Sequence, residues 1–153
     1  MVDLIELTNA QVDTFRAIPE LVAALADGDP ANVIAYYDIN PDMNDWVLAQ
    51  YQSPAGSVLV GWEQSARNSA ETMEMWVHNF SYFVRGQPGQ SAFTIINLLM
   101  KGVPDPGDGQ RWYMCEFLPG TLPGQVQLIE RVTDEEQVDL YVIRCEITET
   151  GDL

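Results

Sequence analysis

Alternating apolar positions predict one strand more strongly than any other element of this chain. Between Glu74 and Arg85, one set of alternate positions carries large side chains, namely Trp76, His78, Phe80, Tyr82 and Val84. The other set also contains apolar side chains, namely Met75, Val77 and Phe83. Because consecutive side chains of a strand point to opposite faces, this strand is partly apolar on both sides. We expect a central strand, covered by a helix on one face and by another sheet or a neighbouring subunit on the other.

Shorter apolar runs predict the remaining strands. The run from Ser57 to Glu63 lies between turn residues, which is typical of a buried strand. The following segment, Gln64 to Thr72, has no periodic apolar face and is expected to form a long exposed loop. A short strand is expected over Asn32 to Asp38, which is rich in β-branched and aromatic residues. Three more strands are expected toward the end of the chain, over Arg111 to Leu118, Val126 to Val132 and Val138 to Thr148.

Helical spacing of apolar residues occurs in two places. From Ala10 to Ala26 the spacing is helical, and Pro19 either interrupts the pattern or begins a second helix in its first turn. We predict the main helix over Pro19 to Ala26. Another helix is predicted from Ser91, a residue that can cap its N-terminus, to about Met100. For Asp42 to Tyr51 a helix is an open alternative.

The order of these elements indicates the fold class. Helices do not alternate one by one with the strands, which disfavours a doubly wound parallel sheet. A chain of 153 residues is of a length that suits one domain. We therefore expect a single α+β domain over residues 1–153, built on a mainly antiparallel sheet with two or three helices packed on one face.

The charge of the chain excludes some partners. Asp and Glu number 23 against 7 Lys plus Arg, a net charge of -16, and no basic cluster is present to neutralise phosphates. Tight wrapping of nucleic acid is therefore not expected. The hydrophobic fraction of 46% is typical of a folded globular protein, so the acidity does not indicate disorder. No apolar stretch has membrane-spanning length and no signal peptide is recognisable, which predicts a cytosolic protein without a membrane partner.

Few residues suggest chemistry. His78 is the only histidine. Nucleophilic catalysis would need a Ser or Cys beside it, and Ser81 and Cys115 are candidates for that position. A structural or interface role for His78 is favoured over catalysis. The two cysteines, Cys115 and Cys145, lie in apolar runs and are expected to be reduced core residues. The acidic clusters fall in predicted turns, where carboxylates are usually solvated. The residues thus predict no catalytic, metal or cofactor site, and a surface cation site stays only as a minor alternative.

Four segments carry a family resemblance. They are Val58-Leu59-Val60-Gly61-Trp62-Glu63 after a Pro-Ala-Gly turn, His78-Asn79-Phe80-Ser81-Tyr82-Phe83-Val84, Ile96-Asn97-Leu98-Leu99 followed by Gly102-Val103-Pro104, and the terminal Glu149-Thr150-Gly151-Asp152. In this order, and over about Pro19 to Asp152, the chain resembles the tail terminator proteins, also called tail completion proteins, of long-tailed bacteriophages.

The resemblance implies a structural protein of the virion rather than an enzyme, without a cofactor. A compact α+β subunit is expected to form a hexameric ring on the head-proximal end of the tail tube. This ring ends tube polymerisation and joins the tail to the head. The implied partners are further copies of the chain, the tail tube protein and a head-completion or connector protein. DNA passes through the lumen without specific binding, and the location is the tail and neck of a virion assembled in the bacterial cytoplasm.

A closed ring of identical subunits uses heterologous contacts, so each subunit needs two different contact surfaces. The candidate interface residues lie on the double-faced strand, in the expected loop and at the tip of the last hairpin: Trp76, His78, Phe80, Tyr82, Arg67, Asp134, Glu135 and Glu136. Two other functions stay open. One is another neck or head-completion protein of the same phage class. The other is a small acidic enzyme or ligand-binding domain, in which His78 and a carboxylate would converge in a pocket.

Overall fold

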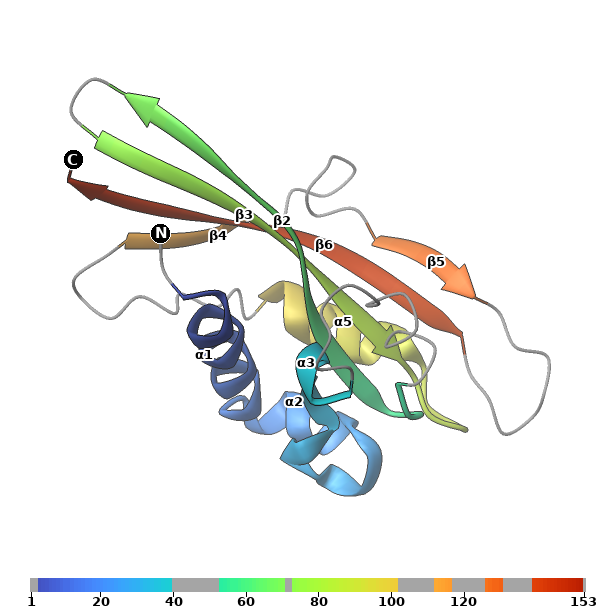
Figure 1. The fold of residues 1–153 in the computed structure, drawn as a ribbon. Helices are drawn as coiled ribbons and strands as arrows, with labels where there is room; N and C mark the ends of the chain where they lie inside the picture. Colours follow the sequence, from blue (N-terminus) through green and yellow to red (C-terminus); the bar gives the residue numbers. More distant parts are fainter. Residues whose placement is uncertain are drawn as a thin grey trace.

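A mixed six-stranded sheet with helices packed against it forms a single α+β domain (Figure 1). The computed structural model describes residues 3–39, 53–70, 73–101, 112–116, 126–130 and 139–152. Its helices are α1 (Leu4–Arg16), α2 (Pro19–Ala24), α3 (Tyr36–Ile39) and α5 (Ala92–Lys101), with short 3-10 turns at Ala26–Gly28 and Pro30–Asn32. Its strands are β1 (Val33–Ala35), β2 (Ser57–Ala70), β3 (Met73–Arg85), β4 (Trp112–Glu116), β5 (Val126–Glu130) and β6 (Leu140–Asp152). The predicted fold class is confirmed.

The sheet has the strand order β1-β2-β3-β6-β4, and β5 also pairs with β6. Only β1 and β2 run parallel, whereas every other neighbouring pair is antiparallel. On β6, β4 pairs with residues 146–150 and β5 with residues 140–143. The two short strands therefore follow each other along β6, and β3, in the centre, pairs along its full length with both β2 and β6.

Local sequence signals determine where the helices begin. The carboxylate of Asp3 accepts hydrogen bonds from the backbone N–H groups of Ile5 (2.8 Å) and Glu6 (3.2 Å), which caps α1. Pro19 is the first residue of α2, where its missing N–H costs no helical hydrogen bond. Ser91 precedes α5, and its hydroxyl accepts from the backbone N–H of Phe93 at 3.2 Å, as its predicted capping role requires.

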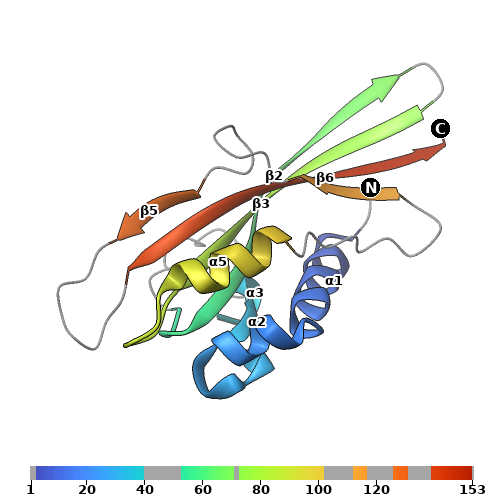
Figure 2. The same cartoon turned by 180° about the vertical axis from the view of Figure 1, so that it is seen from behind.

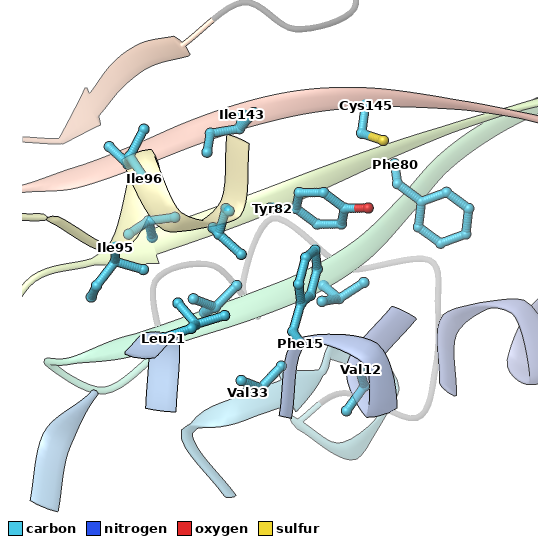
Figure 3. Packing of buried hydrophobic residues seen from close by; sticks show 14 of the residues in the cluster. Val12, Phe15, Leu21, Val33, Phe80, Tyr82, Ile95, Ile96, Ile143 and Cys145 are labelled. Atoms are coloured by element: carbon cyan, nitrogen blue, oxygen red, sulfur yellow. The ribbon is translucent and has the colours of Figure 1, made fainter. Parts of the chain in front are cut away.

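The main core lies between the sheet and helices α1, α2 and α5 (Figure 2). Alternate residues Phe80, Tyr82 and Val84 of β3 are fully buried on this side. The ring of Phe15 from α1 meets the ring of Tyr82 edge-on, with centroids 5.1 Å apart (Figure 3). Cys145 of β6 belongs to the same core. The predicted periodicity of β3 thus places its aromatic side chains under the helices.

A smaller apolar cluster lies on the other face of the sheet. Its buried members are Tyr36, Leu59, Phe83, Leu140 and Val142. Ile34 and Ile39, from β1 and α3, are partly buried against it. Both faces of β3 are therefore covered along its second half. Part of the cover on this second face comes from the β1–α3 segment of the same chain.

The structure corrects the prediction for the segment that follows Glu63. The expected loop over Gln64 to Thr72 is wrong up to Ala70, because β2 continues to that residue and stays in register with β3. Pairing with β3 gives this polar segment its backbone hydrogen bonds, and such long-range pairing overrides weak local strand propensity.

Other boundaries also differ from the predictions. The longest N-terminal helix is α1, whereas Pro19 begins a shorter second helix. The strand expected over Asn32 to Asp38 is limited to Val33–Ala35, after which the chain enters α3. The segment Asp42 to Tyr51 and the hairpin tip over residues 134–137 lie outside the described residues.

Candidate functional site

A row of hydrogen-bonded side chains connects β2 to β3 at a β-bulge. The register of the two strands shifts between Trp62 and Gln64. Next to the shift, the indole N–H of Trp62 donates to the hydroxyl oxygen of Ser65 at 2.8 Å. The same oxygen lies 2.6 Å from Nδ1 of His78. When His78 carries its single ring proton on Nε2, Nδ1 accepts the hydroxyl proton of Ser65. The row then joins an indole, a hydroxyl and an imidazole across two strands.

This row fixes His78 inside the folded chain. Its side chain is fully buried. The ring of Trp76, two residues earlier on β3, is nearly parallel to the His78 ring, with centroids 6.4 Å apart and an interplanar angle of 6°. Because a bulge adds twist and changes the direction of a strand, side chains that fix the bulge also fix the direction of the rest of β2. We infer a positioning role for the row.

The hydroxyl next to His78 belongs to Ser65, whereas the nucleophile candidates from the sequence were Ser81 and Cys115. Ser81 is three residues from His78 on the same strand, so its side chain points to the opposite face of the sheet. Cys115 is paired in register with Ile147, which is itself paired with His78. Ser65 was missed because its position opposite His78 depends on strand pairing in a segment that was expected to be a loop.

The cysteine prediction is wrong for Cys145. This residue is fully buried, as expected, but it is disulfide-bonded and not reduced. Cys115 lies in β4, whose side chains are outside the described part of the structure.

An ion pair crosses the opposite face of the sheet beside the same bulge. A carboxylate oxygen of Glu63, on β2, lies 3.7 Å from Nε of Arg144, on β6. Both side chains are partly exposed. A pair of this kind contributes at most about 1 kcal/mol. It connects two strands that are separated by β3, and so adds a second link across the sheet near the bulge.

Beyond the bulge, the strands extend past the helices (Figure 1, Figure 2). We call this section the distal sheet. It comprises residues 64–70 of β2, 73–79 of β3, 146–152 of β6 and 112–116 of β4. Its strand order is β2-β3-β6-β4. Within the described chain, no strand pairs with the outer side of β2 after Val60, and none pairs with the outer side of β4. In this part of the chain, the two outer strands of the distal sheet therefore have no strand paired on their outer sides.

The predicted interface residues are divided between the core and the distal sheet. His78, Phe80 and Tyr82 are fully buried within the chain itself. Trp76 is half-buried and Arg67 is exposed, and the two are paired in register across β2 and β3. Asp134, Glu135 and Glu136 lie outside the described residues. The structure thus brings Trp76 and Arg67 together on the distal sheet and places the other three strand residues inside.

The open edge of β2 is the feature that the sequence analysis missed. One signal was available, because the segment from Gln64 to Thr72 contains neither glycine nor proline. Those two residues are the usual marks of a loop or turn. Their absence over nine consecutive residues is compatible with a strand that is polar because it is exposed.

Comparison with known proteins does not assign a family. A scan against protein-family models finds no match, and a search of curated proteins finds no significant similarity. Within the described ranges, no helix is long and apolar enough to cross a membrane. The same residues contain no group of three or more His, Cys, Asp or Glu side chains placed to hold a metal ion.

Proposed function

We propose that the protein is a structural subunit of the tail of a long-tailed bacteriophage. In this proposal it forms a ring, with six copies as the expected number, at the head-proximal end of the tail tube. The ring ends tube polymerisation and joins the tail to the head connector. The resemblance of the ordered segments from Pro19 to Asp152 to tail terminator proteins supports this function.

The structural observation that carries the proposal is the distal sheet, whose two edges have no paired strand within the residues that the structure describes. Strands β2, β3 and β6 are 14, 13 and 13 residues long, whereas strands in globular proteins usually have about 5 or 6. A long open edge promotes pairing with another chain, and proteins that stay monomeric protect such edges. A ring needs two different contact surfaces on each subunit. The outer sides of β2 and β4 are two such surfaces.

The charge of the chain fits the same proposal. A net charge of -16 repels phosphates, which suits a ring through which DNA passes without specific binding. The further partners are the tail tube protein on one side of the ring and a head-completion or connector protein on the other. The proposed location is the neck of the virion, after assembly in the bacterial cytoplasm.

Light scattering coupled to size-exclusion chromatography tests the proposal. The subunit mass is 17.1 kDa, and we expect a species of about six times this mass, alone or after addition of tail tube protein. A protein that remains a monomer under both conditions, and that does not bind the tube protein, contradicts the proposal.

A hydrolytic function is the second candidate, and the Ser65–His78 contact favours it. A separation of 2.6 Å between a hydroxyl and an imidazole nitrogen is within the range of a nucleophile and its base. Trp62 donates to the same hydroxyl oxygen, which reduces its nucleophilicity. A fluorophosphonate probe distinguishes the two functions. Labelling of Ser65 that is lost in His78→Gln supports hydrolysis, and an unlabelled protein excludes this serine as an activated nucleophile.

A further inference from the structure

Exposed apolar side chains gather where α5, β5 and β6 meet. Within the described chain, three large apolar side chains are more than a third exposed: Ile5 on α1 (50%), Phe93 on α5 (51%) and Leu128 on β5 (38%). The ring of Phe93 lies against the ring of Tyr141 on β6, with centroids 5.1 Å apart. Leu128 is paired in register with Tyr141, and directly opposite residues of an antiparallel pair project from the same face. We call Phe93, Leu128 and Tyr141 the α5–β5 patch.

The α5–β5 patch lies where the layer of helices ends. Helix α5 packs Ile95, Ile96 and Leu99 into the main core. Phe93 is on the side of the same helix that meets Tyr141, and half of its surface stays exposed. In Figure 2, β5 lies beyond β6 and outside the area that the helices cover. The patch therefore joins the side of α5 to the neighbouring part of the sheet.

The charges that border the α5–β5 patch are acidic. A carboxylate oxygen of Asp139 accepts a hydrogen bond from the hydroxyl of Tyr141 at 3.5 Å. The sequences of β5, α5 and residues 139–143 contain two acidic residues, Glu130 and Asp139. Their one basic residue, Lys101, is the last residue of α5, at the end of the helix far from the patch. A net charge of -16 adds to this negative field, so cationic groups are attracted to the patch.

The size of the patch argues against a second copy of the chain as its occupant. A whole aromatic side chain has a surface of about 150–250 Å², so the exposed half of Phe93 offers about 100 Å² and the whole patch about 200 Å². A stable interface between two proteins buries about 800 Å² on each partner. Two copies would also bring two net charges of -16 together. The patch is instead of a size for one or two apolar side chains of a short segment.

We propose that the α5–β5 patch binds a short peptide segment in which one or two large apolar side chains lie between lysine or arginine residues. The apolar side chains pack on Phe93 and Leu128, because a few such anchors carry most of the binding energy of a contact. The basic residues face Asp139 and the surrounding negative field, which favours this partner over an acidic one. The patch lies outside the distal sheet, so the inference goes beyond the proposed ring and does not depend on it.

Two designed peptides test the binding of such a segment. The probe is fluorescein-labelled Lys-Lys-Leu-Trp-Leu-Lys-Lys, and fluorescence anisotropy measures its binding to the wild-type chain. The control peptide has the same lysines, with serine in place of leucine and tryptophan, and so reports attraction to the net charge alone. Because the contact area is small, we expect a Kd of about 10 μM to 1 mM for the probe. The serine peptide should bind at least about tenfold more weakly.

Substitutions locate the binding site on the chain. Phe93→Ala should weaken binding of the probe at least about tenfold, because it removes the largest apolar surface of the patch. Ile5→Ala is the matched control, since Ile5 is as exposed as Phe93 but lies on α1, and it should leave the Kd unchanged. Asp139→Asn removes the charge and keeps an oxygen that can accept from Tyr141. We expect this variant to bind the probe about twofold to fivefold more weakly.

The outcomes separate the peptide site from the other possibilities. Weaker binding of the serine peptide and weaker binding by Phe93→Ala support the site, whereas equal affinities in either comparison overturn it. If circular dichroism shows that Phe93→Ala is unfolded, Leu128→Ala takes its place, with an expected loss of at least about threefold. Self-association of the wild type that Phe93→Ala abolishes makes a second copy the occupant and overturns the proposal. A chain that binds the probe and forms no ring supports this site and contradicts the proposed function.

Discussion

Removing the hydroxyl group of Tyr82 tests how α1 is held against the sheet. This hydroxyl donates to Oε1 of Gln11, and Nε2 of Gln11 donates to the backbone carbonyl of Leu7 at 3.1 Å. The side chains of Tyr82 and Gln11 are fully buried. In Tyr82→Phe, the ring that contacts Phe15 is retained, so the change removes a hydrogen bond and not the packing.

The expected loss of stability depends on Oε1 of Gln11, which Tyr82→Phe leaves buried without this donor. A typical internal hydrogen bond contributes about 1 kcal/mol net, whereas a buried acceptor without a donor costs about 1 to 3 kcal/mol. We expect Tyr82→Phe to lower the free energy of unfolding by about 2 kcal/mol. In a protein of this size, that loss corresponds to a decrease in melting temperature of about 4 to 8 °C. The double variant Tyr82→Phe with Gln11→Leu should lose less than the sum of the two single variants, because both polar partners are then removed.

Urea unfolding followed by tryptophan fluorescence measures these free energies. All four proteins are compared at one protein concentration, because association changes the apparent stability. A loss below about 0.5 kcal/mol in Tyr82→Phe, or strict additivity of the two substitutions, would refute the coupling between α1 and β3 through this hydrogen bond.

Three further outcomes are expected. Phe80→Ala should lower the free energy of unfolding by about 3 to 5 kcal/mol, since Phe80 is fully buried, and an unchanged urea midpoint contradicts its core position. Gly56→Ala should destabilise the protein more than Gly28→Ala. Both glycines have positive φ (+71° and +61°), so both substitutions strain the backbone. At Gly56, an added Cβ would also lie 2.8 Å from the backbone nitrogen of Ala26, whereas the space at Gly28 is open. Equal melting temperatures of the two variants would exclude that clash. Burial raises the pKa of Tyr82 above its ordinary value of 10.0, so the unfolded chain releases this proton first. The stabilisation that comes from the raised pKa of Tyr82 is complete below pH 10 and is lost as the pH rises further. Between pH 10 and 11, the free energy of unfolding should therefore decrease more steeply in the wild type than in Tyr82→Phe. Equal decreases in the two proteins, measured by urea unfolding, would contradict this.

The central strand and its surroundings were predictable from sequence. Alternation along Glu74 to Arg85 correctly separates Phe80 and Tyr82, which face the helices, from Phe83, which faces the smaller cluster. The cap at Ser91 was predicted from an equally local signal, and the α+β class followed from the order of elements that such signals predict. Such features depend on residues near one another in the chain, and burial of apolar side chains on two faces leaves a clear periodic pattern.

The distal part of β2 was not predictable in the same way. Residues 64–70 are polar, and they form a strand because β3 pairs with them. The contact between Ser65 and His78 also depends on the shifted register at the bulge, which no spacing along the chain reveals. The assignment of Arg67 to an exposed loop was therefore wrong in its secondary structure, although its side chain is exposed as expected.

Electron microscopy of tail tubes shows whether the protein binds a tube end and stops its growth. Tail tube protein is polymerised with the wild-type chain and without it, and the tube ends and lengths are compared. We predict a ring at one end of each tube and tubes that stop growing once the ring is bound. Tubes of unchanged length, with no added density at either end, would contradict the proposed function.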